Sequence, residues 1–375
     1  MMNFPRRRLI FGGLAGAGLV AAVGGGAVWA VDAQDSAAYD AAVQETWRHS
    51  ETFDAPAPIA QRELVRYATL AANSHNTQPW RFGFSDGSIS LAPDLARRLA
   101  VVDPDNHHLF CSLGCATENL RLAAAAFGFH ATSRFDESAQ GIRIDLEKAP
   151  AATSPLFEAI PKRQSTRSVF DGRPVPVEHL RLLEAAGTED GVELRLFTER
   201  KPIEDILGFL VAGDSAQMDD AAFIRELKRW LRFNYAEALA KEDGLFTKAS
   251  GNPVAPSWLG RALFRYIVTK EGENDTYEKQ LRSSAGVAVF ISDKNEPASW
   301  SAAGRCCQRF ALQATALNIR HCFINQPVEV PAVRGSFASY LGVGDRRPDL
   351  VMRFGYGPEL PRSLRRPLDR VIVAA

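Results

Sequence analysis

The stretch "NSHNTQPWRF", residues 73–82, joins a segment with helical periodicity to one that alternates like a strand. A plain helix-to-strand connection needs a glycine or a proline and little else. Pro79 favours an extended conformation for the residue before it, and Trp80 is placed to anchor the turn in the core. Asn76 and Gln78 can offer donors and acceptors to a heteroaromatic edge. The stretch is therefore either a ligand-binding loop or a rigid loop that caps its own helix.

Periodicity on both sides of this stretch predicts an α+β chain. Helical spacing is found in residues 61–72, 105–127, 175–187 and 299–319. Strand patterns are found in residues 80–84, 88–93, 141–147, 192–197, 285–292 and 347–357. A polar and aromatic insertion, mostly helical in pattern, occupies about residues 213–280 and has no counterpart in the first half.

The two halves of the chain match in order and, weakly, in sequence. "RHSETFD" (48–54) lines up with "RQSTRSVFD" (163–171), and "SLGCATENLRLAAAAFG" (112–128) lines up with "AAGRCCQRFALQATALN" (302–318). This pattern indicates an old duplication. We expect a first half at 45–150 and a second at 155–375, arranged side by side as a pseudo-dimer that leaves the chain monomeric.

The first 35 residues have the features of an export segment. Three arginines, Arg6 to Arg8, precede an uncharged stretch from Leu9 to Val31. The paired arginines before "LIFGG" are typical of twin-arginine signals, and small residues near Ala30 fit a cleavage site. The stretch is also long enough to be a membrane anchor. Both interpretations place the protein outside the cytoplasm, in the periplasm or the cell envelope, with the twin-arginine machinery as a partner.

Charge and cysteine content narrow the class of function. Basic and acidic residues both number 44, so the formal net charge is zero, which disfavours nucleic acid as a partner. The five cysteines include no CxxC pair, so neither a disulfide framework nor a zinc site is expected. Cys306 and Cys307 are expected to pack in the core of a helix. His107 and His108 should diverge on a helix, which makes them weak metal candidates.

Two basic stretches are candidate phosphate sites. In "KRQSTRSVF" (162–170), Arg163, Ser165 and Arg167 alternate and would point the same way in an extended segment. Two guanidinium groups flanking a hydroxyl suit a phosphate. "LPRSLRRPL" (360–368) adds Arg362 and Arg365 after the last predicted strand. Taken alone, each stretch is equally compatible with a solvated basic turn or tail.

Taken together, the three stretches resemble the FMN-dependent nitroreductase family. "NSHNTQPWRF" resembles that family's helix-to-strand signature, "RQSTR" its N-terminal flavin motif, and "RFGYGPELPRSLRRPL" its C-terminal end. The resemblance runs from about residue 45 to the end, apart from the insertion. It is nearest to the Acg-type branch, in which one chain mimics the usual dimer, and it implies a nitroreductase-like α+β fold.

The order of the motifs implies one composite site. In ordinary members the arginine motif precedes the amide loop in one chain, and two subunits share each flavin. Here the arginine motif is complete only in the second half, and the amide loop only in the first. In the twin positions Thr52 replaces a basic residue, and Glu189 and Asp190 stand where the amides would be. These two acidic residues would repel a phosphate-bearing ligand, so we expect one FMN per chain.

The resemblance assigns roles to residues of both halves. Ser74, Asn76 and Gln78 are expected to face the flavin. Arg163, Gln164 and Ser165 are expected at the phosphate or ribityl chain, with Arg362 and Arg365 nearby. Arg167 is expected beside the N1 and C2-carbonyl edge, where a cation raises the flavin potential. By analogy, the backbone around Asn325 and Gln326 is expected near N5.

The implied activity is transfer of hydride through flavin N5, from NAD(P)H to a small electron-poor acceptor such as a nitroaromatic or a quinone. No side-chain acid, nucleophile or metal is required, because the cofactor carries the chemistry. The alternative is a flavin-holding protein with little turnover, in which the insertion closes the pocket as a lid. A more distant alternative is a binding module without cofactor. "GFSDG" (83–87) matches a nucleophile elbow, but a strand follows it, so Ser85 is expected in a turn.

Overall fold

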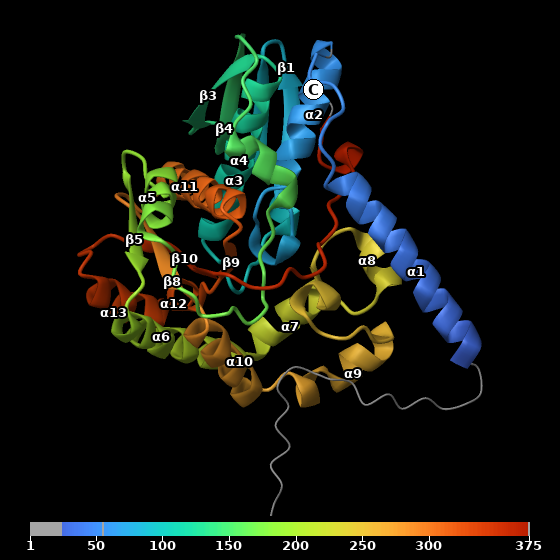
Figure 1. Ribbon diagram of the computed structural model, residues 1–375, viewed down its shortest axis with the longest axis vertical. Helices are drawn as coiled ribbons and strands as arrows, with labels where there is room; N and C mark the ends of the chain where they lie inside the picture. The colour runs from blue at the N-terminus through green and yellow to red at the C-terminus, as the bar shows by residue number, and fades with distance from the viewer. Residues whose placement is uncertain (1–24, 55, 374–375) are drawn as a thin grey trace, which may run out of the picture.

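The computed structural model describes residues 25–54 and 56–373 (Figure 1). Most of the candidate leader, residues 1–24, lies outside this part of the chain. Within the described residues, no helix combines the length and apolar character needed to cross a bilayer. Helix α1 (Gly25–Thr46) runs across the expected boundary at residue 35. Tyr39 of this helix donates a hydrogen bond to the Arg362 carbonyl, and Trp47, the residue after the helix, donates one to the Ser363 carbonyl.

The first half contains a four-stranded antiparallel sheet in the order β1-β2-β4-β3. Its strands are β1 (Trp80–Ser85), β2 (Ser88–Pro93), β3 (Phe129–Asp136) and β4 (Gly141–Lys148). The β1–β2 hairpin turns at Asp86 and Gly87, and the positive φ of 64° at Gly87 is one that glycine adopts without strain. Ser85 therefore ends a strand beside a tight turn, as expected, and Trp80 is fully buried.

The second half repeats this topology strand for strand. Its sheet has the order β5-β8-β10-β9, again antiparallel throughout. The strands are β5 (Val192–Phe197), β8 (Gly286–Ser292), β9 (Arg320–Phe323) and β10 (Pro348–Gly355). Replacing each strand of the first sheet by the strand of the same rank in the second gives the same order. The expected α+β class with two related halves is confirmed.

Two long helices lie between the halves and form their interface: α3 (His107–Ala126) and α11 (Pro297–Ala316) (Figure 1). A Cβ on Gly114 would lie 1.9 Å from the carbonyl oxygen of Ser301, and a Cβ on Gly304 would lie 2.0 Å from that of Cys111. In the alignment of the two halves, Gly114 corresponds to Gly304 and Cys111 corresponds to Ser301. The contact is thus reciprocal, as at a two-fold interface.

The same reciprocity continues along the two helices. Glu118 pairs with Arg309 at 3.1 Å, and Asn119 accepts from Gln308 at 2.7 Å. In the alignment Glu118 corresponds to Gln308 and Asn119 to Arg309, so each contact is the mirror of the other. Cys306 and Cys307 are buried in this interface region, as predicted.

The insertion is wider than the sequence pattern indicated. It stands where the first half has a two-residue turn, and it comprises the whole segment between β5 and β8. The sequence pattern placed its start near residue 213, but helix α6 (Arg200–Asp219) continues through that position without a break. The insertion then forms α7 (Ala221–Trp230), β6 (Leu231–Arg232), α8 (Tyr235–Lys241), β7 (Leu245–Phe246), α9 (Ser257–Ile267) and α10 (Lys270–Arg282). Trp230 and Phe223 pack against Leu99 and Val102 of the first half.

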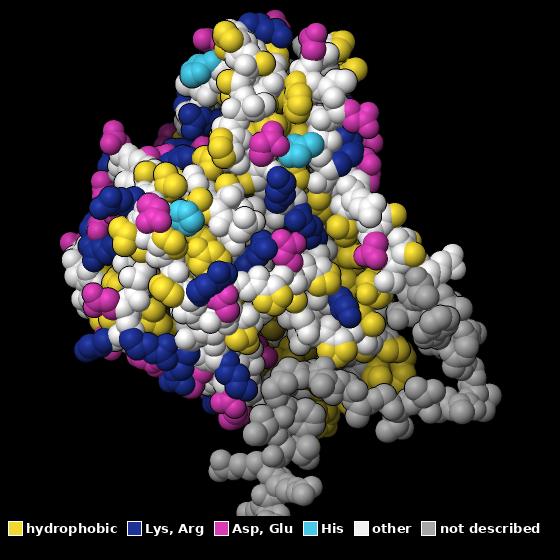
Figure 2. All heavy atoms as spheres, viewed as in Figure 1, with side chains coloured by type: hydrophobic (Ala, Val, Ile, Leu, Met, Phe, Trp, Pro, Cys, Tyr) yellow, Lys and Arg dark blue, Asp and Glu magenta, His cyan; other side chains and the backbone are white. Residues whose placement is uncertain are grey.

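The remaining helices flank the sheets. They are α2 (Ala57–Thr69), α4 (Pro155–Ala159), α5 (Val177–Gly187), α12 (Gln326–Glu329) and α13 (Pro331–Leu341). After β10 the chain crosses to the first half, where the amide of Phe82 donates to Val371 and that of Val373 donates to Phe82, both at 2.8 Å. Segment 356–373 thereby links the second half to the edge of the first sheet. Basic and acidic side chains are interspersed over the face in Figure 2.

Candidate functional site

The loop after α2 has an unusual backbone. His75, Asn76 and Gln78 have φ values of 49°, 52° and 52°, so three residues with side chains adopt the left-handed conformation within four positions. The loop is closed by Asn73, whose Oδ1 accepts from the amide of Gln78 at 2.9 Å. Such clustered strain persists only where the surroundings enforce it, and it is concentrated at functional sites.

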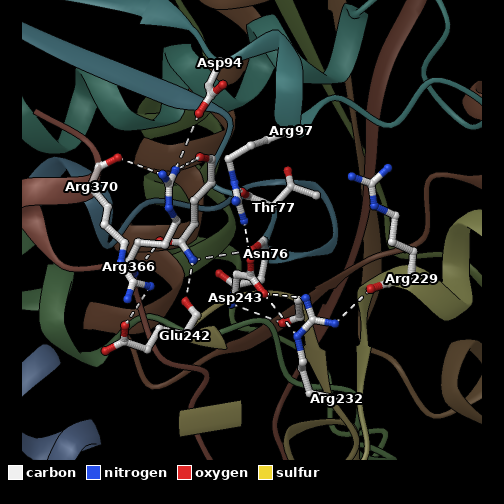
Figure 3. A network of polar contacts seen from close by, with 12 residues as sticks. Asn76, Thr77, Asp94, Arg97, Arg229, Arg232, Glu242, Asp243, Arg366 and Arg370 are labelled. Atoms are coloured by element: carbon white, nitrogen blue, oxygen red, sulfur yellow. Dashed lines mark hydrogen bonds and ion pairs between the residues drawn. The ribbon is translucent and has the colours of Figure 1, made fainter. Parts of the chain in front are cut away.

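Hydrogen bonds from the side chains of Asn76 and Gln78 hold the insertion against this loop. Figure 3 shows Asn76 close to Glu242 and Asp243 of the insertion. Asn76 Nδ2 donates to the carbonyls of Gly244 and Leu364, both at 3.2 Å, and Gly244 N donates back to the Asn76 carbonyl. Gln78 Nε2 donates to the carbonyl of Glu242 at 2.8 Å, while its Oε1 accepts from Arg366 N. Both side chains are buried.

An outer set of ion pairs fixes the same junction. Asp243 pairs with Arg97 of the first half and with Arg232 of the insertion, and Arg97 also donates to the Thr77 carbonyl (Figure 3). The structure therefore gives the two amides an anchoring role, which sequence reasoning did not anticipate. Direct contact of Asn76, Gln78 and Ser74 with a flavin remains a prediction.

The arginines of the second half meet the loop at the end of α2. Arg163 Nη2 donates to the Leu70 carbonyl at 3.1 Å. Arg365 Nε donates to the Thr69 carbonyl at 2.8 Å and its Nη1 to Asn76 Oδ1 at 2.9 Å. The last carbonyls of a helix have no partner inside the helix and attract cations. Arg163 and Arg365 thus meet at the Leu70 carbonyl, and Arg365 also reaches the amide loop at Asn76. That these residues hold one ligand together stays a prediction.

No carboxylate of the described residues lies within ion-pair distance of this arginine cluster, although the charge of Glu359 acts on Arg362. Within the described residues, Arg163, Arg362 and Arg365 form no ion pair with a carboxylate, although Arg163 is only 3% exposed. Burial lowers the pKa of Arg163 to about 10, with a further contribution from Arg362. Burial and the nearby Arg163 lower the pKa of Arg365 to about 9. Buried charges are normally paired, so the cluster has the charge pattern of an anion site.

Unpartnered polar atoms surround the same cluster. In the described part of the chain, the buried atoms without a hydrogen-bond partner include Arg163 Nε, Gln164 Nε2, Thr166 Oγ1 and both ring nitrogens of His321. Gln164 Oε1 accepts from Leu360 N, and Ser165 lies beside β9 in a parallel bridge to His321. Most buried polar groups in proteins are satisfied. Donors left over beside unpaired arginines fit the phosphate and ribityl hydroxyls of FMN.

Arg167, Asn325 and Gln326 are the remaining predicted residues of the second half. Arg167 carries no ion pair within the described residues, and its charge acts on His75 and on Tyr277 of α10. Asn325 Oδ1 accepts from Val351 N at 2.9 Å and so fixes the start of α12. Gln326 is buried against α6, because a Cβ on Gly213 would lie 2.6 Å from the Gln326 carbonyl oxygen.

Asp214, next to that contact, is an acid the sequence did not single out. It is 5% exposed, and its Oδ2 has no partner among the described residues. Burial, assisted by the negative charge of Glu273, raises the pKa of Asp214 to about 7. At pH values between the ordinary carboxyl pKa and this raised value, Asp214 is protonated in the folded chain and ionised in the unfolded chain. The free energy of unfolding therefore falls as the pH rises through this range.

We therefore expect Asp214→Asn to stabilise the protein in a pH-dependent manner. The gain should grow as pH rises from about 4 to about 7 and then level off at roughly 1–3 kcal/mol. Urea unfolding at several pH values measures it. Asp345→Asn, at an exposed carboxyl, should give a curve parallel to that of the wild type. A parallel curve for Asp214→Asn would disprove the assignment.

The position of the amide loop in the pseudo-symmetric twin carries ion pairs. Arg309, which corresponds to Asn119 in the repeat, donates from Nε to the Ala186 carbonyl at the end of α5. Arg309 also pairs with Glu118 and with Glu189 at 2.8 Å, and Arg305 pairs with Glu189. The sequence suggested that Glu189 is a free charge that repels a phosphate. In the structure Glu189 is paired with two arginines. It neutralises Arg305 and Arg309 instead.

The two histidines at the start of α3 also differ from expectation. Their rings lie 4.9 Å apart and both are buried. His107 Nε2 lies 2.7 Å from Asp349 Oδ1, and His108 Nδ1 lies 3.4 Å from Glu329 Oε1. The carboxylates come from residues more than 200 positions away in the chain, so sequence spacing gave no signal. Among the described residues no cluster of side chains could hold a metal ion.

The chain has distant relatives among known proteins. No family model matches it. "Putative NAD(P)H nitroreductase Rv3131" of Mycobacterium tuberculosis (strain ATCC 25618 / H37Rv) is 25% identical over 327 residues, covering 83% of this chain and 90% of that protein. "Putative NAD(P)H nitroreductase acg" of the same strain is 25% identical over 329 residues, covering 83% and 94%. The chain is a distant relative of these two proteins.

Solved structures overlap the chain in part. A nitroreductase with bound FMN from Bacteroides fragilis is 18% identical, with a TM-score of 0.35, and covers 57% of this chain and 96% of its own. The FMN-dependent nitroreductase NfnB from Mycobacterium smegmatis, in complex with NADPH, is 15% identical, with a TM-score of 0.37, and covers 56% and 94%.

Proposed function

We propose that the chain is an exported FMN-binding oxidoreductase that transfers hydride from NAD(P)H to a small electron-poor acceptor, such as a nitroaromatic or a quinone. One observation carries this proposal. A cluster of arginines without a counter-ion, from the second half and the C-terminal segment, meets a left-handed amide loop of the first half. The resemblance of both motifs to flavin-binding sequences supports FMN as the ligand, and the names of the distant relatives support NAD(P)H as the donor.

Each part of the site has a role in this proposal. Arg163, Arg362 and Arg365 neutralise the phosphate, and Gln164 and Ser165 bind along the ribityl chain. Ser74 and the loop backbone line the ring, and Arg167 places a positive charge beside its N1 and C2-carbonyl edge. When bound, FMN supplies the hydride chemistry. The insertion, anchored through Asn76 and Gln78, excludes water from the ring and shapes the substrate pocket.

The first test is cofactor content and reduction. The purified full chain should be yellow and release one FMN per chain on denaturation. NADH or NADPH, added without oxygen, should bleach the flavin within seconds, and a nitroaromatic or quinone should restore the colour. A folded but colourless protein that does not bind added FMN would refute the proposal.

The second candidate function is flavin holding with little turnover. The hydrogen bonds between the amide loop and residues 242–244 favour it, because they fix the insertion against the loop by contacts within the chain itself. A bound flavin that stays oxidised with both nicotinamide donors, yet is bleached by dithionite, would support this function over the first. Export is tested separately by replacing Arg6 and Arg7 with lysine and following the protein in cell fractions.

A further inference from the structure

Helix α9 of the insertion exposes large apolar side chains to solvent. Trp258 is 72% exposed and Tyr266 is 65% exposed, and these are the two highest values among the large apolar side chains of the described residues. Leu263 and Ile267 of the same helix are exposed as well. Apolar side chains scattered singly over a surface need no explanation, but four within ten residues indicate an interaction surface.

The exposed residues occupy one side of the helix. Successive residues of an α-helix are rotated by about 100°, so Trp258, Ala262 and Tyr266 follow one another in steps of about 40°. Leu263 and Ile267 continue the same arc, which covers about half of the helix circumference. All five residues are exposed, and no charged residue of α9 falls within the arc. The outward half of α9 is therefore apolar.

The opposite side of α9 fixes the helix to the rest of the insertion. Phe264 is buried, and a Cβ on Gly260 would lie 2.3 Å from Cδ1 of Phe233. Just before the helix, the amide of Ala255 donates to the Phe233 carbonyl at 2.9 Å. Glycine at position 260 allows this close approach, so α9 is held with its apolar half facing outward.

The charge around this apolar face has one sign. From Gly244 to Lys270 the sequence contains four basic residues and no acidic one. Lys248 is exposed, and Arg261, next to the apolar arc, is 45% exposed. Arg261 pairs with Glu237, but that carboxylate is only 14% exposed, so the guanidinium stands nearer to the solvent. An apolar helix face with Trp, Tyr and bordering basic residues fits a bilayer surface with anionic headgroups.

The N-terminal segment approaches the same end of the molecule. Residues 9–24 lie outside the described chain, contain no charged residue and lead directly into α1. Figure 1 shows the first turn of α1 and helix α9 toward the same, lower end of the longest axis. In Figure 2, hydrophobic side chains gather where α9 lies in Figure 1. A bilayer that holds the residues before Gly25 would therefore lie on the side of the molecule that carries α9.

The size of the face distinguishes a bilayer from a protein partner. The eleven residues of α9 form a helix about 16 Å long and about 10 Å wide, which gives a face of roughly 160 Å². A stable protein–protein interface buries about 800 Å² on each partner. A bilayer requires no matched surface of that size, because interfacial Trp and Tyr side chains insert among the headgroups individually.

We propose that the apolar face of α9 inserts into the headgroup region of an anionic bilayer and docks the protein on the membrane surface. The helix lies in the plane of the interface, with Trp258 and Tyr266 pointing into the lipid and Arg261 beside the headgroups. This inference is independent of the proposed function, because none of these side chains belongs to the predicted flavin site.

The first measurement places an environment-sensitive dye on the apolar face. Leu263→Cys in the full chain is labelled with nitrobenzoxadiazole, and the five native cysteines are all buried. Vesicles of phosphatidylcholine and phosphatidylglycerol should shift the dye emission to the blue and raise its intensity at least about twofold, because the dye leaves water. Val177→Cys, exposed on α5 and away from α9 in Figure 1, is the matched control and should not respond.

The second measurement removes the largest apolar side chain. In the chain labelled at position 263, Trp258→Ser should reduce the dye response about fivefold at the lipid concentration that half-saturates the parent, which corresponds to a tenfold loss of affinity. Ile59→Ser, at an exposed side chain of α2, should leave the response unchanged. Vesicles of phosphatidylcholine alone should give a clearly weaker response. FMN content should be the same in all variants.

A dye at position 263 that does not respond to vesicles would overturn the docking of α9, whether or not the chain sediments with the lipid. Blue emission without vesicles at every protein concentration would overturn it in favour of residues 1–24 of the same chain as the cover. Blue emission without vesicles that appears only as the protein is concentrated would identify a second copy instead. Each of these outcomes leaves the proposed function standing, and a chain that docks without binding FMN would refute only the proposed function.

Discussion

Arg163→Met should lose FMN while the protein without cofactor stays as stable as the wild type or becomes more stable. Arg163 is a buried guanidinium with no carboxylate partner within the described chain, and burial already lowers its pKa to about 10. Removing an uncompensated buried charge costs the empty protein little. The bound phosphate would lose a buried cation, so affinity should fall on the order of 100-fold, or roughly 3 kcal/mol. Fluorescence titration with FMN and urea unfolding measure the two quantities.

Arg309→Met is the contrasting control, because Arg309 also donates to a carbonyl at the end of a helix but is paired with carboxylates. Its guanidinium is paired with Glu118 and Glu189, and its removal leaves each of these carboxylates with one remaining arginine, Arg121 and Arg305 respectively. We expect a loss of stability of about 1–3 kcal/mol and no change in FMN affinity for the folded protein. Equal effects of the two substitutions on FMN binding would show that Arg163 has no special part in holding the cofactor.

Gly114→Ala and Gly304→Ala should each destabilise the protein strongly. The new methyl carbon would lie within 2.0 Å of a carbonyl oxygen of the facing helix, which is far inside contact distance. Because the obstacle is helix backbone, α3 and α11 must move apart along the interface of the halves. We expect a loss of about 2–4 kcal/mol in the free energy of unfolding for each variant.

The double variant provides the sharper result. Both methyl groups push the same pair of helices apart, so the combined loss should be clearly smaller than the sum of the single losses. Gly208→Ala is the control, since this exposed glycine of α6 has no atom within 4 Å of an added Cβ. It should stabilise the chain by about 0.5–1 kcal/mol. Additive losses at the interface would contradict the shared displacement.

Much of the fold is readable from the sequence, because regular burial leaves regular patterns. The β1–β2 hairpin is marked by Asp86 and Gly87, and β8 by an unbroken apolar run that is buried at every position. Strand β3 was not predicted, since it lies at the edge of the sheet and its polar residues alternate poorly. The width of the insertion was missed because α6 is periodic across residue 213.

The site was predictable only as far as its motifs are local. The approach of Arg163 and Arg365 to the end of α2, just before the loop, followed from motif order. The left-handed conformation of His75 and Asn76 did not, because neither residue requires it and the tertiary contacts impose it. Partners far apart in the chain, such as Glu329 for His108, leave no periodic signal. The anchoring of the insertion by Asn76 is likewise a property of the assembled structure.

The reciprocal contact of α3 and α11 changes how this site depends on protein concentration. In a protein built from separate copies, dilution takes the two contributors to the pocket apart. Here both contributors are covalently joined, so their association is an intramolecular event with a fixed effective concentration. The pocket should therefore remain assembled in a compartment where the protein is scarce, and its ligand affinity should be the same at every dilution.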